Sequence, residues 1–371
     1  MKRIDYNENP FIVIWEVTRA CALSCVHCRA EAQFHRYPGE LDTAQGKALI
    51  RDIHAMNNPI LVFTGGDPLM REDLFELTEY AASLGMRVSM TPSATPRVTH
   101  DAVKRAKDAG LTRWAFSLDG PDAKSHDYFR GTRGSFERTL RGISYFREEC
   151  MSFQINTTVT EYNVDQLPEI AKLVGELGVS VWTLFFLVPT GRGSLLQPIS
   201  PERHEDVLRW AFALQEHVPF IISTTEAQFY RRIARQENQR RKNEGLPPIG
   251  HPHDDLAKAP RGTNDGNGFV FISHTGDVQP SGFLPITCGN VKQTPLADIY
   301  RQHPVFQSLR DPDTHHGKCG YCEYRYVCGG SRARAYAVTG DYKAEEPYCI
   351  YQPTTTTQTK SAGSSQCSLF V

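Results

Sequence analysis

Short runs of β-branched and aromatic residues alternate with amphipathic segments through the first two thirds of the chain. Six runs have the length and composition of buried strands, and they span residues 11–17, 59–65, 87–92, 113–120, 152–160 and 180–188. Between them lie helical patterns such as 71–85 and 167–178, each ending at a glycine that can terminate a helix. Strands that alternate with helices form parallel sheets. Six such units predict a partial (β/α)6 TIM-like barrel, since a complete barrel has eight.

The pattern also divides the chain into regions. Residues 1–225 hold the expected barrel, and residues 226–268 read as a polar helix with a basic end and a Pro/Gly-rich linker. Residues 269–351 begin with a β-hairpin that turns at 274–277 and continue into a cysteine-rich segment. Residues 352–371 are rich in Thr and Ser, which predicts a disordered tail. The expected fold class is α/β, a partial barrel with a small C-terminal cysteine-rich hairpin/helix domain.

Charge and hydropathy exclude some classes of partner. The formal net charge is -1, so the whole chain has no strong attraction to nucleic acid or to an anionic membrane. The N-terminal segment lacks the apolar core of a signal peptide, and no apolar run reaches the length of a membrane span. We therefore expect a cytoplasmic protein with neither nucleic acid nor membrane as a partner.

The 10 cysteines are clustered rather than scattered. Three lie within eight residues and four more lie near the C-terminus, at Cys21, Cys25, Cys28, Cys319, Cys322, Cys328 and Cys349. Cys150, Cys288 and Cys367 stand alone. In a reducing compartment, clustered thiols indicate metal ligands or redox groups rather than a framework of disulfides.

The first cluster follows the first predicted strand, as Cys21-x3-Cys25-x2-Cys28. Active sites of barrels lie at the carboxyl ends of the strands, which is where this loop is expected. A closed zinc or four-iron site uses four protein ligands, so three thiols leave one coordination position for an outside ligand. A zinc site completed by His27 or by another residue is the alternative.

This loop resembles the cluster-binding loop of the radical S-adenosylmethionine (radical SAM) enzymes, and the resemblance covers about residues 11–350. It implies that Cys21, Cys25 and Cys28 hold a catalytic [4Fe–4S] cluster. The amino and carboxylate groups of SAM would chelate the fourth iron. Reductive cleavage of SAM would then give methionine and a 5′-deoxyadenosyl radical that abstracts hydrogen from a substrate C–H bond.

The stretch "FTGGDPL" ends the second predicted strand and is similar to the glycine-rich motif of this family. By that resemblance Gly65, Gly66 and Asp67 contact SAM, and the backbone receives its methionine amino group. Asp67 stands where the family more often has Glu. Two adjacent glycines allow a ligand to approach the main chain closely, although a tight βα turn explains the pair equally well.

Two further stretches match the family, "SLDG" at 117–120 and "HDYFRG" at 126–131. The resemblance implies that Ser117 and Asp119 belong to the SAM site and that Ser117 donates or accepts a hydrogen bond there. Arg130 would pair with the carboxylate of SAM, a role suited to a planar guanidinium. A surface salt bridge is the alternative for Arg130.

Two weaker matches complete the expected SAM site. "INTTVTEYN" at 155–163 is similar to a strand that contacts the ribose, through Thr157 or Thr158. "LVPTGRG" at 187–193 is similar to the stretch beside adenine, where Pro189 lies. A strand rich in Thr and Val also needs no ligand to explain it.

The second group reads Cys319-x2-Cys322-x5-Cys328-x20-Cys349 and is similar to the auxiliary-cluster domains called SPASM and twitch. Four thiolates complete a coordination sphere, and the resemblance implies one auxiliary [4Fe–4S] cluster. The fuller SPASM motif has cysteines where this chain has Ser281 and Arg332, so a second auxiliary site has lost ligands. Two alternatives stay open, Cys288 as an extra ligand and a structural zinc, because spacing does not separate iron from zinc.

The phrase "CEYRYVCGGSRARAYAVTGD" most resembles enzymes of alternative haem and haem d1 synthesis, which remove or shorten propionate side chains of tetrapyrroles. Maturases of ribosomally made peptides share much of it. A tetrapyrrole or a peptide is therefore the expected substrate, with a flavodoxin- or ferredoxin-type protein as electron donor. A non-catalytic iron–sulfur or zinc scaffold is the alternative of another class.

Two polar segments have no assigned role. The basic residues of 231–242 either meet an anionic substrate or form a solvated helix face, and His251 and His253 lie in the Pro/Gly-rich linker. Either histidine could bind a porphyrin iron, and an ordinary surface loop is the alternative.

Overall fold

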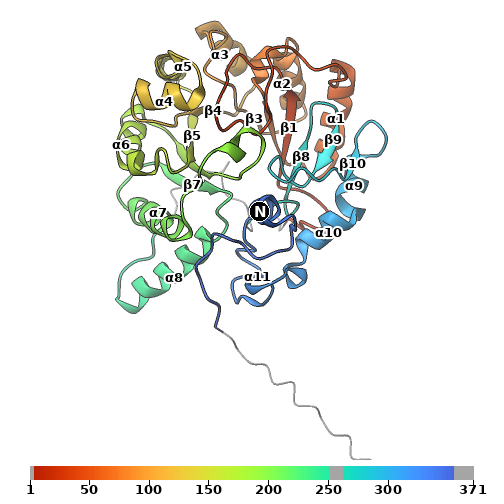
Figure 1. The fold of residues 1–371 in the computed structure, drawn as a ribbon. Helices are drawn as coiled ribbons and strands as arrows, with labels where there is room; N and C mark the ends of the chain where they lie inside the picture. The colour runs from red at the N-terminus through yellow and green to blue at the C-terminus, as the bar shows by residue number, and fades with distance from the viewer. Residues whose placement is uncertain (1–3, 251–261, 355–371) are drawn as a thin grey trace, which may run out of the picture.

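The computed structural model describes residues 4–250 and 262–354. Its centre is a ten-stranded sheet in the order β10-β9-β8-β1-β2-β3-β4-β5-β6-β7. The strands are β1 (Ile12–Thr18), β2 (Ile60–Gly65), β3 (Val88–Met90), β4 (Arg113–Ser117), β5 (Phe153–Val159), β6 (Val181–Phe186), β7 (Ile221–Thr225), β8 (Phe269–Ile272), β9 (Asp277–Gln279) and β10 (Gly289–Asn290). Neighbours from β1 to β7 are parallel, and the sheet curves into a barrel that stays open (Figure 1).

The partial barrel predicted from the sequence is confirmed, and its first six strands fall on the six predicted runs. A seventh parallel strand, β7, was not predicted. Its sequence is IISTT, and only Ile221 and Ile222 in it are apolar. So short an apolar run carries little strand signal, and the chain forms a strand there because β6 offers a free edge.

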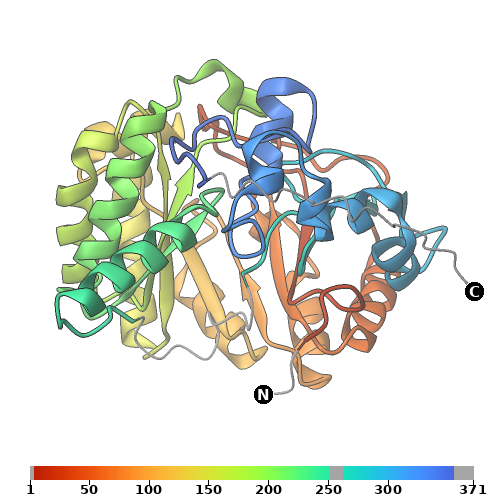
Figure 2. The ribbon, with the colours of Figure 1, turned by 90° about the horizontal axis from the view of Figure 1, so that it is seen from below.

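Helices cover the outer face of the parallel strands (Figures 1 and 2). They are α1 (Thr43–Ala55), α2 (Leu74–Ser83), α3 (His100–Asp108), α4 (Ala123–Arg130), α5 (Ser135–Glu148), α6 (Leu167–Leu177), α7 (Pro201–Leu214) and α8 (Tyr230–Asn243). Asp42 begins α1 with a capping box that includes Gln45. Gly178 ends α6 in the left-handed conformation, with φ of 73°, as the glycine signal predicts.

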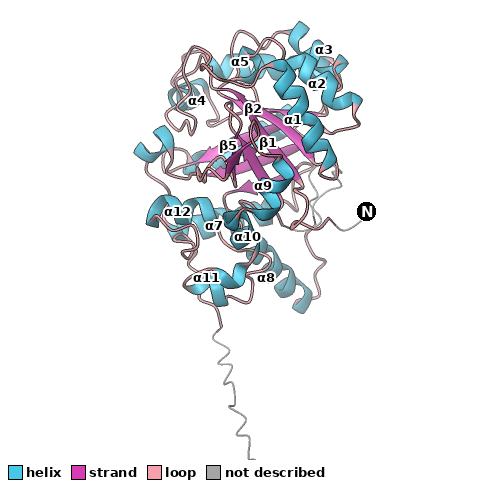
Figure 3. Cartoon of the chain, turned by 90° about the vertical axis from the view of Figure 1, so that its right-hand side faces the viewer, coloured by secondary structure: helices cyan, strands magenta, loops and turns pink. Residues whose placement is uncertain are grey.

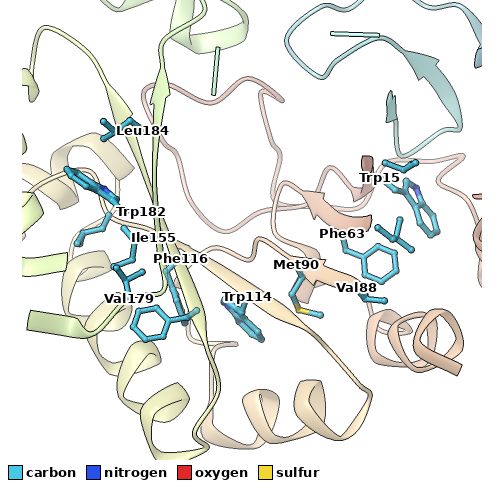
Figure 4. Packing of buried hydrophobic residues seen from close by; sticks show 14 of the residues in the cluster. Trp15, Phe63, Val88, Met90, Trp114, Phe116, Ile155, Val179, Trp182 and Leu184 are labelled. Atoms are coloured by element: carbon cyan, nitrogen blue, oxygen red, sulfur yellow. The ribbon is translucent and has the colours of Figure 1, made fainter. Parts of the chain in front are cut away.

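The hydrophobic core lies between the sheet and these helices. Figure 4 shows the buried side chains that fill it, among them Trp15, Phe63, Trp114, Phe116 and Trp182. Successive side chains of a strand point to opposite faces, so the residues between these face the inside of the barrel. Many of those are polar, which leaves the interior of the barrel available for chemistry rather than packing.

The C-terminal region joins the same sheet. The predicted hairpin is confirmed as β8 and β9, and β8 also pairs in parallel with β1, so its turn lies at the carboxyl end of β1. The helices that follow are α9 (Leu296–Gln302), α10 (Pro304–Arg310), α11 (Lys318–Tyr321) and α12 (Arg332–Thr339). In Figure 3, α10, α11 and α12 lie below the sheet.

Short 3-10 turns complete the structure, at Pro68–Met70, Val164–Gln166, Gly191–Leu195 and Pro312–Thr314. No helix in the described ranges has the length and hydropathy to cross a bilayer. Of the expected tail, residues from 355 onward lie outside the described part of the chain.

Candidate active site

The three-cysteine loop begins directly after β1, at the carboxyl ends of the strands. Cys21 and Cys25 are buried and Cys28 is half-buried, and the three pack together. Backbone N–H groups point at two of the sulfurs, since Leu23 donates to Cys21 Sγ at 3.3 Å and Ala32 donates to Cys28 Sγ at 3.5 Å. Such donors stabilise thiolate ligands of iron–sulfur clusters, so the loop fits that group.

Arg130 supplies the donor to the third sulfur. Its guanidinium lies 3.7 Å from Cys25 Sγ, 3.2 Å from His27 Nε2 and 3.5 Å from Asp119 Oδ2. Burial lowers the pKa of Arg130, but the neighbouring Cys25 and Asp119 outweigh it and the pKa is raised. Arg130 is therefore a buried cation beside the thiols and no surface salt bridge.

His27 does not complete a zinc site in this structure. Its Nε2 faces the Arg130 guanidinium, and its ring stacks on Phe129 with centroids 4.4 Å apart. Burial and the charge of Arg130 hold the pKa of His27 well below its usual value. Among the described residues, no three His, Cys, Asp or Glu side chains are arranged to hold a single metal ion.

The glycine pair at the end of β2 packs against the start of the cysteine loop. A Cβ on Gly65 would lie 2.4 Å from Thr18 O, and one on Gly66 would lie 2.4 Å from Ala20 O. The N–H of Gly66 donates to Thr18 O at 2.9 Å. Close approach of two main chains therefore already requires both glycines.

The Asp67 carboxylate is bonded within the protein. It accepts hydrogen bonds from Leu69 N at 3.1 Å, Ser93 N at 3.3 Å and Thr95 Oγ1 at 3.0 Å. Burial raises its pKa to about 6. Ser93 Oγ lies 3.7 Å from Cys21 Sγ, so Asp67 positions the loop that faces the first thiol.

Asp119 and Ser117 lie at the end of β4. Asp119 Oδ1 accepts from Thr158 N at 2.7 Å, whereas its Oδ2 is buried without a hydrogen-bond partner. Burial raises the pKa of Asp119. Ser117 is half-buried and, as the residue after Phe116, faces the inside of the barrel. Asp119 Oδ2, which forms an ion pair with Arg130 but accepts no hydrogen bond from the described residues, and the inward hydroxyl of Ser117 can both serve a ligand.

Thr157 does not face the interior. Its hydroxyl donates to Leu118 O at 2.6 Å and accepts from Trp182 Nε1 at 2.9 Å, on the helix side of β5. Strand side chains alternate, so a shift of one residue reverses the face. The neighbouring Thr158 is half-buried and lies on the inner face. Of the two threonines predicted as a ribose contact, Thr157 is therefore directed away from the barrel interior and Thr158 towards it.

The segment that contains Pro189 clamps the cysteine loop. Arg192 donates through Nε to Cys25 O at 2.9 Å and through its backbone N to Cys28 O at 3.1 Å. Gly191 adopts φ of 52°, and a Cβ there would lie 2.5 Å from Arg29 O. Pro189 is half-buried at the start of this segment.

The second cysteine group surrounds a hollow of about 400 Å³, part of it open to solvent. All four members of the predicted set line it: Cys319, Cys322, Cys328 and Cys349. Three of the sulfurs accept backbone N–H bonds, for example Cys319 from Glu346 N at 3.3 Å and Cys328 from Gly330 N at 3.4 Å. Four thiols around one hollow, with donors aimed at them, fit a cluster.

Burial raises the pKa of Cys21 to about 11 and that of Cys328 to about 12. Free thiols at these positions therefore stay protonated at neutral pH, and binding of a metal would remove their protons. Cys288 is not among the residues that line the hollow, and it packs in the main core with its Sγ directed at Ile286 O.

Ser281 and Arg332, which stand where the fuller SPASM motif has cysteines, both donate hydrogen bonds to the carboxylate of Asp265. Asp265 accepts a hydrogen bond from the Ser281 side chain and one from Arg332 N at 3.1 Å. The Arg332 guanidinium donates to Ala344 O at 2.6 Å and lies 3.7 Å from Cys319 Sγ. Because these side chains are all buried, a hydrogen-bonded network occupies this region.

Three of the six basic residues in the run on α8 form ion pairs with carboxylates of the protein. Arg232 pairs with Glu205 at 2.5 Å and Arg241 pairs with Glu216 at 2.7 Å. Arg240 bonds to acidic residues of its own helix. This arrangement favours an ion-paired helix over a binding surface for an anion. His251 and His253 lie outside the described residues.

The sequence analysis missed a buried pair inside the barrel, Glu16 and His274, which are 2.7 Å apart. It also missed Glu226, which the fold buries beside Ser331. A signal existed for the first: Glu16 interrupts an otherwise apolar strand, and a buried carboxylate needs a partner.

Comparison with known proteins identifies the family. The model of the radical SAM superfamily matches residues 15–174. The chain is 46% identical to "AdoMet-dependent heme synthase" of Oleidesulfovibrio alaskensis, over 92% of this chain and 87% of that protein. The chain belongs to the radical SAM superfamily. As a radical SAM enzyme, it is expected to use a [4Fe–4S] cluster and SAM, and its thiol loop fits that cluster.

Two other known proteins are also similar to this radical SAM enzyme. It is 31% identical to "Fe-coproporphyrin III synthase" of Methanosarcina barkeri, over 91% of this chain and 87% of that protein. The structure of SuiB from Streptococcus suis, bound to the precursor peptide SuiA, has the same fold with a TM-score of 0.71. That match covers 93% of this chain and 76% of SuiB at 17% identity, so it supports the fold alone.

Proposed function

We propose that this enzyme oxidatively decarboxylates propionate side chains of an iron tetrapyrrole, such as iron-coproporphyrin III, to give vinyl groups. The observation that carries the proposal is the 46% identity over 92% of the chain with a protein named as a haem synthase. Another relative is named for the synthesis of iron-coproporphyrin III, a tetrapyrrole that carries propionate side chains. The iron-coproporphyrin would be the substrate and haem the product.

In the proposed site, Cys21, Cys25 and Cys28 hold the catalytic cluster. When bound, the cluster supplies the electron that cleaves SAM, and the deoxyadenosyl group takes a hydrogen atom from the substrate. Arg130 lies beside Cys25 and Asp119 and would balance their charge.

The remaining proposed contacts to SAM lie at the carboxyl ends of β4 and β5. Ser117 and Asp119 Oδ2, which accepts no hydrogen bond from the described residues, are available for the polar groups of SAM. Thr158 replaces Thr157 as the proposed ribose contact. Gly65 and Gly66 shape the adjoining turn, where a side chain would collide with the cysteine loop.

The chemistry of the substrate explains a second redox centre. Turning one propionate into a vinyl group releases CO2 and removes one hydrogen atom and one electron from the side chain. The hydrogen atom leaves as 5′-deoxyadenosine, and the electron needs an acceptor. We assign that role to an auxiliary [4Fe–4S] cluster on Cys319, Cys322, Cys328 and Cys349, within an auxiliary region formed by residues 269–351. A flavodoxin- or ferredoxin-type donor would reduce the catalytic cluster, in a reducing cytoplasm where thiols persist.

Exposed apolar side chains support a large, flat, apolar substrate. Phe34 is 64% exposed and Leu195 is 86% exposed, and both lie on loops at the carboxyl ends of the strands. Tyr128 and Tyr162 are also exposed at this end, with ring centroids 4.8 Å apart. Exposed apolar residues in one region mark binding surfaces, and a porphyrin macrocycle would cover such side chains.

The test uses anaerobically reconstituted enzyme with SAM, dithionite and iron-coproporphyrin III. We expect haem, with one 5′-deoxyadenosine for each CO2 released, and loss of both products in Cys25→Ala. Deoxyadenosine without conversion of the porphyrin would refute the substrate and favour a peptide maturase, the second candidate. A fully loaded protein that leaves SAM intact would favour a non-catalytic scaffold.

A further inference from the structure

A histidine and a carboxylate pair inside the barrel, and neither is a proposed ligand of either cluster. His274 lies in the turn between β8 and β9, and its Nδ1 is 2.7 Å from Glu16 Oε1 on β1. The other oxygen of Glu16 accepts from Arg29 at 2.7 Å. His274 is 6% exposed and Glu16 is 3% exposed, so the fold encloses the pair.

The pairing fixes which ring nitrogen of His274 is free. Burial alone would raise the pKa of Glu16, but the hydrogen bond from His274 and the charge of Arg29 lower it to about 2. An ionised Glu16 only accepts hydrogen bonds, so Nδ1 carries the proton and donates it. In the neutral imidazole, Nε2 then holds a lone pair, and this buried nitrogen has no hydrogen-bond partner among the described residues.

Two other described histidines also bury a ring nitrogen without a hydrogen-bond partner, but neither is bonded to a carboxylate through its other nitrogen. His27 faces the Arg130 guanidinium with its other nitrogen, and both ring nitrogens of His315 lack partners. Only His274 among them is held by a carboxylate. Histidines that ligate metals almost always donate their second ring N–H to such a partner.

His274 lies at the end of the barrel where the thiol loop begins. Its turn lies at the carboxyl end of β1, and Arg29, which also bonds Glu16, directly follows Cys28 in the chain. The ring of Tyr37 packs against the imidazole at an angle of 86°, with centroids 5.2 Å apart. Tyr37 is 46% exposed, so His274 lies beneath a surface side chain on the face that holds the thiol loop.

We infer that His274 binds the iron of the tetrapyrrole substrate through Nε2, with Glu16 holding the ring in place. This inference rests on the proposed function. Decarboxylation must present one propionate at a time to the radical, which requires a macrocycle in a fixed orientation. The loss of CO2, a hydrogen atom and an electron moves no proton to a base, so a free imidazole lone pair has no acid–base task in this reaction.

The test is a binding titration of the reconstituted holoenzyme without SAM or reductant. The probes are ferric coproporphyrin III and metal-free coproporphyrin III, followed by the Soret band and, for the iron form, by electron paramagnetic resonance. We expect an imidazole-type spectrum in the wild type. In His274→Ala, this spectrum should be lost and the Kd for the iron form should rise about tenfold or more. The Kd for the metal-free form should stay within about twofold, and added imidazole should restore the spectrum.

Two variants keep the test decisive. His274→Gln retains a donor for Glu16 but offers no imidazole, so it should lose the imidazole-type spectrum and the affinity for the iron form. This variant keeps the inference testable if His274→Ala unfolds the hairpin. His100→Ala is the matched control, because His100 forms a His–Glu pair with Glu149 on the surface. It should leave both Kd values and the spectrum unchanged.

The outcomes separate this inference from the proposed function. A wild-type enzyme that makes haem while both His274 variants keep its spectrum and affinity would overturn the assignment of His274 alone. A wild-type enzyme that binds neither porphyrin would overturn the proposed function, and the inference with it.

Discussion

Replacing Gly66 by alanine tests whether the end of β2 sets the geometry of the thiol loop. A Cβ at this position would lie 2.4 Å from Ala20 O and 2.5 Å from Arg19 O. Both atoms belong to the backbone, which cannot rotate away as a flexible side chain can. The next residue along is Cys21, so any displacement of Ala20 moves the first thiol.

The size of the effect follows from these distances. An ordinary contact of a Cβ begins near 3.4 Å, so the Ala20 carbonyl must retreat by about 1 Å. Overpacking of this kind costs about 1–3 kcal/mol of unfolding free energy. A displacement of about 1 Å in catalytic geometry lowers rates by roughly 10²-fold. We therefore expect Gly66→Ala to fold with reduced stability and to lose about 10²-fold in the formation of 5′-deoxyadenosine.

The assay compares iron content, thermal unfolding and deoxyadenosine formation between wild type and variant. Gly175→Ala is the matched control, because it lies in α6 and a Cβ there would meet only Phe220 at 3.6 Å. That change should stabilise the protein by up to about 1 kcal/mol and leave the rate unchanged. Wild-type iron content and a wild-type rate in Gly66→Ala would refute the reasoning.

Three further predictions concern the C-terminal region. Arg334→Met should lower the free energy of unfolding by about 3–5 kcal/mol, since it removes the ion pair of the buried Glu346 carboxylate, whereas Arg240→Met on the surface should leave that free energy nearly unchanged, both measured by chemical denaturation. Burial raises the pKa of Glu226 to about 8, so wild-type stability should fall as pH rises from 6 to 8, by at most about 1.4 kcal/mol per pH unit. Glu226→Gln should flatten that slope, and an equal slope in both proteins would contradict the raised pKa of Glu226. Cys319→Ala should lower iron from about eight to about four per chain while deoxyadenosine still forms, and the exposed Cys150→Ala should change neither.

The parts of the fold that depend on local pattern could be predicted from the sequence. Apolar runs bounded by glycine or polar residues located β1 to β6, because each strand is buried between the helices and the barrel interior. The hairpin at 274–277 carried a turn signal, and β8 and β9 formed there. The four C-terminal cysteines were expected to share one site, and they line one hollow.

What could not be predicted depends on contacts between distant parts of the chain. The pattern of β5 does not tell which of two adjacent threonines faces inward, since both faces of the strand are covered, and Thr157 bonds to Trp182 on the helix side. Glu16 and His274 are separated by 258 positions and meet only because β8 pairs with β1. No periodicity along the sequence encodes that pairing.

The same pairing bears on how an electron released from a substrate in the barrel could reach the second cysteine group. β8 continues the sheet that carries the thiol loop, so the region after the hairpin is attached to the barrel by backbone hydrogen bonds. Just beyond Cys328, Ser331 Oγ bonds to Glu226 after β7, and Arg334 donates to Phe186 O and Leu187 O at the end of β6. The segment that holds the four thiols is therefore fastened to the carboxyl ends of the barrel strands at several points. A redox centre held there would keep a constant distance to a substrate in the barrel, as the proposed acceptor of the electron released with CO2 requires.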